Sequence, residues 1–204
     1  MVSGSFAPIV RNLGLIGLLC GATSVAHAAT DTAHADVESA LLHRQLDLSR
    51  AQQWDPKRNR WLPLYLPPAK VYVVNLWSVF CKPCLTEFPQ LRLLSHGWQS
   101  QRQVQFVFLS DPPTDATDAE VAAFWHKNAS AVPDTGPARS DTIQLRQSLE
   151  NDQNPITLLL DEHFVVRQAF VGSLGARPIG RAIERLLQAT SPPQRPHPGK
   201  AARR

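Results

Sequence analysis

Cysteine is scarce in this chain of 204 residues, which contains only Cys20, Cys81 and Cys84. A disulfide framework needs more cysteines at wider spacing, and a zinc site needs two more ligands beside a close pair. Both are therefore excluded as the main use of the thiols. Cys81 and Cys84 stand close together, with only Lys82 and Pro83 between them. This spacing leaves redox chemistry as the leading interpretation.

A confident membrane-spanning run is also missing. The apolar stretch LGLIGLLCGATSVAHAA follows the lone basic residue Arg11 and includes the small-x-small step at 26–28. It is too short and too rich in glycine for a membrane span, and its order is typical of a secretory signal. We expect residues 1–28 to be a signal peptide, cleaved after Ala28; an uncleaved segment would instead anchor the protein in a membrane. Cys20 would leave with the signal.

The part of the chain between the N-terminal signal-like stretch and the C-terminal tail has no excess of positive or negative residues. Residues 191–204 (SPPQRPHPGKAARR) contain no acid and no apolar run, which predicts a disordered basic tail. Without the four basic residues of this tail and Arg11, Lys plus Arg falls from 21 to 16, against 17 Asp plus Glu. The sequence pI of about 9.3 therefore comes largely from the ends. A near-neutral body argues against a nucleic-acid surface.

Two buried strands and a helix between them organise the centre of the sequence. VYVVNLW (71–77) and VQFVFLS (104–110) are β-branched and aromatic runs, as expected of strands covered on both faces. The stretch between them has a helical apolar stripe of Cys84, Phe88, Leu91, Ser95 and Trp98. This order predicts a right-handed βαβ unit.

The flanking segments complete an α/β domain. We expect a short amphipathic helix within 30–50, an extended edge and loop over 54–70, helices at 115–127 and 177–189, and a hairpin of strands 156–161 and 164–172. Residues 128–153 are polar and uninformative. The prediction is a central mixed sheet of four to five strands with helices on both faces. The domain would cover 65–190, preceded by an N-terminal helix and extended segment over 29–64.

The position of the thiol pair explains its spacing. A helix that begins at Cys81 places this sulfur among unpaired backbone N–H groups at the positive end of the helix dipole, which stabilises the thiolate. Cys84, one turn on, points inward and can resolve a mixed disulfide. Pro83 falls in the first turn, where a missing N–H costs little. Lys82 adds a positive charge nearby. A C-x-x-C pair beside a βαβ unit is typical of thioredoxin-like redox proteins.

The stretch VVNLWSVFCKPCLTEFPQL resembles the exported thioredoxin-like reductases of the ResA/TlpA type. The positions that carry the resemblance are Asn75, Trp77, Cys81, Pro83, Cys84, Glu87, Phe88 and Pro89. It implies a thioredoxin fold whose only cofactor is the redox-active disulfide Cys81–Cys84. One departure is Phe80, where the family usually has tryptophan, so the aromatic wall is kept and the indole N–H is lost. A second is the proline-rich 55–69, where the usual hairpin is hard to find.

The resemblance assigns further residues to the site. Pro155 would be the cis-proline that begins the strand opposite the thiols, and Asn154 would supply backbone contacts to a substrate peptide. Together with Trp77, Phe80, Lys82 and Pro83 they would form the redox motif and substrate groove. Glu87 would be a partly buried carboxylate that opposes thiolate formation and relays a proton to Cys84. Asn75 occupies the place of a buried aspartate in cytoplasmic thioredoxins.

The resulting hypothesis is a periplasmic thiol–disulfide oxidoreductase that reduces protein disulfides. By resemblance, its electron donor would be a membrane thiol transporter, and its substrates would belong to cytochrome c or copper-site maturation. Two alternatives stay open. One is a thiol oxidase or isomerase of the same fold, because the reduction potential sets the direction. The other is a copper-binding assembly protein that uses Cys81, Cys84 and His163.

Overall fold

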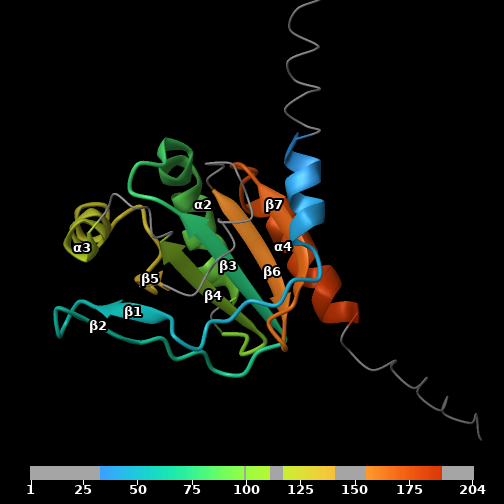
Figure 1. Cartoon of the computed structure of the whole chain (residues 1–204), viewed down its shortest axis with the longest axis horizontal. Coiled ribbons are helices and arrows are strands. Elements are labelled where there is room, and N and C mark those ends of the chain that lie inside the picture. Colours follow the sequence, from blue (N-terminus) through green and yellow to red (C-terminus); the bar gives the residue numbers. More distant parts are fainter. Residues whose placement is uncertain (1–32, 99, 111–116, 141–154, 190–204) are drawn as a thin grey trace, which may run out of the picture. The chain divides into compact units, whose positions relative to one another are not determined.

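The computed structural model describes residues 33–98, 100–110, 117–140 and 155–189 (Figure 1). The expected signal peptide, the basic tail and Asn154 lie outside these residues. The chain divides after Ala33 into two units, and the description concerns the second, His34–Arg204. Within the described ranges, every helix is too short or too polar to cross a membrane.

A seven-stranded mixed sheet forms the centre of this unit, with the strand order β2-β1-β5-β4-β3-β6-β7. Strands β3, β4 and β5 are parallel, and β6 runs antiparallel to both β3 and β7. The hairpin of β1 and β2 adds to the other edge through β5. The strands are β1 Gln52–Asp55, β2 Arg60–Pro63, β3 Val71–Trp77, β4 Val104–Ser110, β5 Pro137–Arg139, β6 Ile156–Asp161 and β7 Val166–Val171. Three helices follow the first strands of the sheet: α2 Lys82–Trp98, α3 Asp118–Lys127 and α4 Ala176–Ala189.

The predicted number of four to five strands is too low, because three short strands, β1, β2 and β5, escape the sequence pattern. Strands β1 and β2 form a hairpin, paired Trp54 to Trp61, that begins just before the segment expected to be extended edge and loop. Strand β5 lies in the stretch 128–153 that gives no pattern. The sequence of β1, QQWD, does not alternate between apolar and polar residues, and all four residues are half-buried. The alternation that marks a strand is therefore absent.

The N-terminal helix occupies only the first part of the range 30–50 in which it is expected. Residues 34–41 are helical, but His43 has a φ of 66°, in the left-handed region that ends a helix. The chain then runs extended beside β7, where the N–H of Leu46 donates to the carbonyl of Phe164 at 2.9 Å. Leu46 and Leu48 are buried as alternate residues of an extended segment, not as neighbours on a helix. Residues 34–64 therefore belong to the same packed unit as the rest of the sheet.

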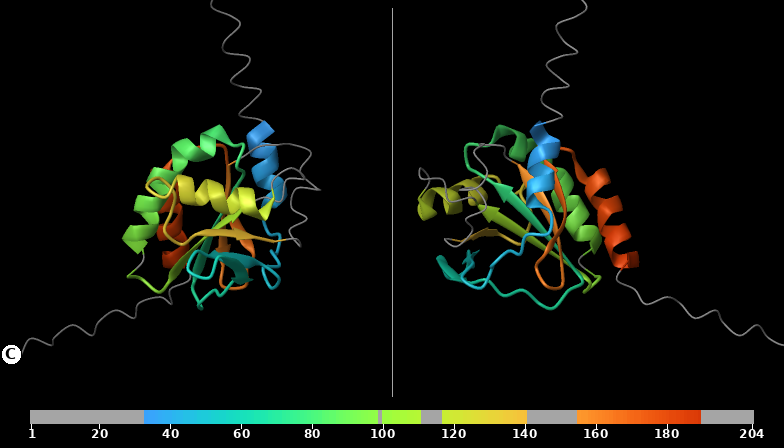
Figure 2. Two further views of the ribbon diagram at one scale, coloured as in Figure 1. Left: turned by 90° about the vertical axis from the view of Figure 1, so that its left-hand side faces the viewer. Right: turned by 45° about the vertical axis from the view of Figure 1, so that its right-hand side comes forward.

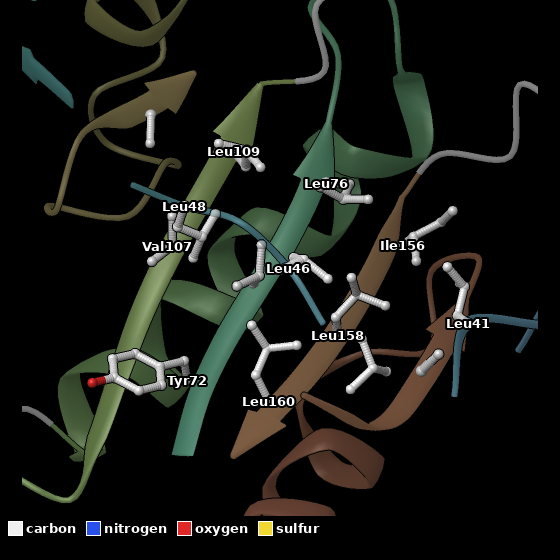
Figure 3. Packing of buried hydrophobic residues seen from close by; sticks show 14 of the residues in the cluster. Leu41, Leu46, Leu48, Tyr72, Leu76, Val107, Leu109, Ile156, Leu158 and Leu160 are labelled. Atoms are coloured by element: carbon white, nitrogen blue, oxygen red, sulfur yellow. The ribbon is translucent and has the colours of Figure 1, made fainter. Parts of the chain in front are cut away.

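The sheet separates two hydrophobic cores. On β3, Tyr72, Val74 and Leu76 point to one side, and Val71, Val73 and Trp77 point to the other. The first side, here called the aliphatic face, packs mostly leucine, isoleucine and valine beneath residues 34–51 (Figure 3). The second, the aromatic face, is covered by α2, α3 and α4 (Figure 2). Helices α2 and α4 contact each other there.

Candidate redox-active site

The two cysteines lie at the junction of β3 and α2. Strand β3 ends at Trp77, and α2 begins at Lys82. Between them Ser78 shapes a turn: its carbonyl accepts the Cys81 N–H at 3.1 Å, and its hydroxyl accepts the Phe80 N–H at 3.2 Å. Cys81 and Cys84 form a disulfide, with their Cα atoms 5.4 Å apart. The predicted pairing at the start of a helix is therefore present.

The sulfur of Cys81 occupies the place of a helix cap. Cys81 immediately precedes α2, and its Sγ accepts the backbone N–H of Cys84 at 3.1 Å. In most helices a side-chain oxygen performs this role and satisfies one of the four unpaired N–H groups of the first turn. An acceptor in this position gains more from the contact when it carries a negative charge. The geometry therefore stabilises the thiolate form of Cys81 once the disulfide is reduced.

The two sulfurs differ in access. Cys81 is 8% exposed, whereas Cys84 is 1% exposed. Lys82 and Pro83 are exposed between them, and Phe80 stands beside the pair with 66% of its surface exposed. A disulfide on another molecule can therefore approach Cys81 past Phe80, but it cannot reach Cys84 directly.

Trp77 belongs to the motif but not to the accessible surface. Its side chain is completely buried, and its ring lies 5.5 Å from Phe88, 5.3 Å from Phe124 and 5.1 Å from Trp125. These contacts join β3, α2 and α3 behind the disulfide. Trp77 therefore supports the end of β3 from below and cannot line a substrate groove.

Glu87 is a buried carboxyl group one turn after Cys84. Its Oε1 accepts the N–H groups of Leu174 and Gly175, each at 3.2 Å. Its Oε2 has no hydrogen-bond partner in the part of the chain that the structure describes. Burial raises the pKa of Glu87, and the two N–H groups and the nearby Asn75 amide offset part of this rise. The neutral form of Glu87 therefore persists to higher pH than that of an exposed glutamate.

Asn75 fixes the strand pair beside this carboxyl group. It is buried on β3, and its Nδ2 donates to Thr157 Oγ1 of β6 at 2.9 Å. This bond ties the strand that leads to Cys81 to the strand that follows Pro155. An asparagine in this place is uncharged and cannot accept a proton as a carboxylate would.

The loop before α4 is a part of the site that the sequence analysis missed. Gly172 and Gly175 have φ values of 83° and 77°, in the region that favours glycine. The N–H of Ala176 donates to Gln90 Oε1 at 3.3 Å, so α2 side chains hold this loop at two points, Glu87 and Gln90. A Cβ atom at Gly175 would lie 2.5 Å from Gln90 Oε1. The two glycines were the available sequence signal.

Pro155 lies at the same end of the sheet as the disulfide. It directly precedes β6, whose first residue Ile156 pairs with Leu76 near the end of β3. Its carbonyl accepts the Gly172 N–H at 2.9 Å. The cis state of Pro155 and the substrate contacts of Asn154 stay predictions.

The hypothesis of a copper site that includes His163 is wrong. Val71, at the start of β3, pairs with Asp161, and His163 lies just beyond Asp161. Cys81 lies beyond the opposite end of β3, which has seven residues. At about 3.3 Å per residue, the two sites are separated by roughly 20 Å. No group of three His, Cys, Asp or Glu side chains that could hold a metal occurs among the described residues.

Comparisons with known proteins place this geometry in a wider group. No protein-family model and no curated protein matches the sequence. Solved structures do match. A thiol-disulfide isomerase from Corynebacterium glutamicum is 19% identical with a TM-score of 0.54, over 71% of this chain and 96% of its own. A thiol:disulfide interchange protein from a Bacteroides species is 14% identical with a TM-score of 0.54, over 76% and 96%.

A third structure agrees with these two. A thioredoxin-related protein from Neisseria meningitidis serogroup B is 20% identical with a TM-score of 0.51, over 68% of this chain and 98% of its own. The chain has a thioredoxin fold. The predicted fold class is therefore confirmed, with a larger sheet than expected. At such identities the likeness establishes the fold and leaves the activity to be argued from the site.

Proposed function

We propose that the protein is an exported thiol–disulfide oxidoreductase that reduces disulfide bonds in other proteins. The observation that carries this proposal is the asymmetry of the pair. The sulfur of Cys81, a residue that is 8% exposed, caps α2, and its partner Cys84 lies one turn below and is 1% exposed. A structural disulfide needs neither feature, whereas an exchange reaction needs an accessible nucleophile and a protected resolving thiol.

The reaction begins with the reduced dithiol. The Cys81 thiolate attacks one sulfur of a substrate disulfide, forming a mixed disulfide and releasing the other substrate sulfur as a thiolate, which takes up a proton. Cys84 then loses its proton, and its thiolate attacks Cys81 Sγ and releases the second substrate thiol. The substrate gains two electrons and two protons, and the protein ends with the Cys81–Cys84 disulfide present in this structure.

Glu87 serves the second step as a proton acceptor. Cys84 is buried and must lose its proton without help from bulk water. Glu87 lies three residues further along α2, on the same face of the helix. Because burial raises its pKa, its carboxylate is a stronger base than an exposed glutamate. It accepts the Cys84 proton and returns it to solvent or to the departing thiolate.

A reductant must restore the dithiol after each turnover. We propose a membrane thiol donor for this role, since the signal-like sequence of residues 1–28 would place the protein in the periplasm. Support for the family comes from the residues of the motif, which match the pattern of the ResA/TlpA type. The substrates would then be the thiol pairs of proteins that assemble cytochrome c or copper sites.

The direction of electron flow is tested by the reduction potential. Lys82 and Pro83 supply no histidine between the cysteines, which favours a reducing pair. Equilibrating the protein with glutathione buffers and quantifying the Cys81–Cys84 disulfide gives the potential directly. A value near the thioredoxin limit of about −270 mV supports a reductase, and a value near about −120 mV would make the protein an oxidase.

A trapping experiment tests the substrate class. The Cys84→Ala variant cannot resolve mixed disulfides, so it should accumulate substrates bound to Cys81 when it is expressed as an exported protein. A Cys81→Ala, Cys84→Ala double variant is the matched control. Non-reducing gels followed by mass spectrometry identify the adducts. Recovery of no adduct beyond the control would contradict protein disulfides as substrates.

A further inference from the structure

A groove lies between α2 and α4. It has a volume of about 680 Å³, and its walls include Leu93 and Leu94 of α2 and Arg177 and Arg181 of α4. The two helices run next to each other on the aromatic face (Figure 2). They approach closely at Gly180, where a Cβ atom would lie 3.3 Å from the side chain of Leu94. The groove is therefore a hollow along a tight helix pair.

The groove is linked to Glu87 through the loop before α4. Leu174 lines it, and the N–H of the same residue donates to Glu87 Oε1. Gln90 lines it as well and holds the N–H of Ala176. A ligand in the groove would thus rest on the loop that holds the Glu87 carboxyl group. This carboxyl group lies one helical turn from Cys84.

Apolar side chains stand exposed at the groove. Leu93 is 74% exposed and Leu174 is 48% exposed, which makes them two of the five large hydrophobic residues exposed in the described part of the chain. Single exposed leucines are common, but two from different elements at one hollow provide a contact surface for an apolar side chain.

The charge of the groove has one sign. Arg177 and Arg181 are exposed one turn apart on α4, and neither has an ion pair or side-chain hydrogen bond among the described residues. Glu184, one turn further, does not pair with Arg181, and Glu87 is buried and faces the loop. Two free guanidinium groups attract carboxylates, often in bidentate geometry.

We propose that this groove binds an extended segment of the protein substrate, in which an apolar residue is followed by acidic residues a few positions from the reactive cysteine. The inference rests on the proposed function and specifies its substrate class. The apolar residue would lie against Leu93 and Leu174, and the acidic residues would pair with Arg177 and Arg181. The chain's own residues 191–204 contain four basic residues and no acid, so the arginines repel them.

The test compares two peptide disulfides of equal length. Each has one intramolecular disulfide, a spacer of a few residues, and then leucine and two charged residues, which are glutamates in one peptide and lysines in the other. The third substrate is 2,2′-dithiodipyridine, a small neutral disulfide. Its reaction with the reduced protein measures disulfide exchange that does not depend on binding in the groove. Second-order rate constants for oxidation of the reduced protein are measured by stopped-flow tryptophan fluorescence, at low and at high salt.

The wild-type protein should react roughly tenfold faster with the acidic peptide than with the basic one at low salt, and the ratio should shrink at high salt. R177E/R181E should reverse the preference. Leu93→Ser should slow both peptides by roughly threefold, since it removes apolar contact and leaves charge alone. The matched control R102E, at an exposed arginine outside the groove, should leave the ratio unchanged. None of these variants should alter the reaction with 2,2′-dithiodipyridine.

Each contrary outcome has a separate meaning. Equal rates for both peptides, with normal reaction of the small disulfide, would overturn the groove proposal and leave the proposed function intact. Failure of the reduced protein to react with any disulfide would overturn the proposed function and the groove proposal with it. A dimer in sedimentation experiments that dissociates in R177E/R181E would assign the groove to a second copy of the chain and would also overturn the proposal.

Discussion

The two faces of the sheet are built from alternate residues of the same strands, yet they differ in chemistry. The aliphatic face buries residues such as Leu158, Leu160 and Leu76 under the N-terminal segment. The aromatic face buries Trp77 and Phe88 and also two polar side chains, Asn75 and Glu87. Both of these polar side chains have an oxygen without a hydrogen-bond partner within the described ranges.

The polar side chains next to the disulfide are therefore buried on the aromatic face and not on the aliphatic face. Burial of a carboxyl group with one unpaired oxygen costs free energy, which the apolar packing of the other face offsets. The aromatic rings provide a wide rigid base beneath the end of β3, where small shifts would change the position of Cys81. We therefore expect substitutions on the aliphatic face to change stability and substitutions on the aromatic face to change reactivity.

The largest effect is expected from the nucleophile itself. Cys81→Ser should reduce disulfide exchange to the uncatalysed rate, because a serine hydroxyl does not ionise near neutral pH and cannot form a disulfide. Turbidity of insulin during reduction measures the activity. Circular dichroism of the same sample should show a folded protein, since serine is close to cysteine in size and its hydroxyl can also cap α2. Retention of more than a trace of activity would contradict the role of Cys81.

The next effect tests the aliphatic face. Leu158 is completely buried at the centre of β6, so Leu158→Ala should lower the free energy of unfolding by about 3 kcal/mol. The half-exposed Leu42 is a matched control, and Leu42→Ala should cost less than about 0.5 kcal/mol. Urea denaturation measures both. The reduction potential of the disulfide should not change in either variant. A shift in L158A alone would contradict the expectation that the aliphatic face affects stability and not reactivity.

Glu87→Gln tests the aromatic face. The amide oxygen of glutamine can still accept the N–H groups of Leu174 and Gly175, but it cannot take a proton from Cys84. Resolution of a mixed disulfide should therefore slow by roughly tenfold or more. Single-turnover release of a fluorescent thiol measures this step, with Glu184→Gln on the exposed side of α4 as the control. An unchanged rate would contradict the proton-acceptor role.

The same variant has a predicted pH dependence. Burial raises the pKa of Glu87 in the folded state above its unfolded value of about 4.5. The protonated form then favours folding, so this contribution is fully present below the unfolded pKa and is lost as pH rises through the folded pKa. In E87Q the loss is absent, and its stability relative to wild type should increase from pH 4 to pH 8. Urea denaturation across this range would contradict the account if the difference stayed flat.

The smallest effect concerns the cap of α3. Thr117 and Glu120 form a capping box: the Thr117 side chain accepts the Glu120 N–H, and the Glu120 carboxylate accepts the Thr117 N–H at 2.7 Å. Thr117→Ala should cost about 1 kcal/mol of stability. Because α3 covers Trp77 with Phe124 and Trp125, a small change in exchange rate should accompany it. The activation free energy of disulfide exchange and the free energy of unfolding are both measured for this variant. If the activation free energy changes by more than the free energy of unfolding, α3 is a positioning element of the site.

The sequence predicts the long buried elements well and the short strands poorly. Strands β3, β4 and β6 have the expected bounds, because continuous β-branched and aromatic runs allow few alternatives. Strand β5 has three residues, too few for a periodic signal, and its pairing with β1 comes from tertiary contact. His43 ends the N-terminal helix without glycine or proline to announce it.

The site divides in the same way. The placement of Cys81, Cys84 and the burial of Glu87 follow from local spacing on one helix, which sequence reveals. The contacts of Glu87 with Leu174 and Gly175 join segments 87 and 88 residues apart, and no local pattern predicts them. The arginines of α4 likewise become part of a groove only through the packing of α4 against α2.

The central claim is that Cys81 is the reactive thiolate and Cys84 its protected partner. Limited alkylation of the fully reduced protein with iodoacetamide at pH 7, followed by peptide mapping, tests it most directly. The account predicts that Cys81 is modified at least about tenfold faster than Cys84, because it is more accessible and its thiolate accepts the Cys84 N–H. Equal modification of the two, or faster modification of Cys84, would contradict it.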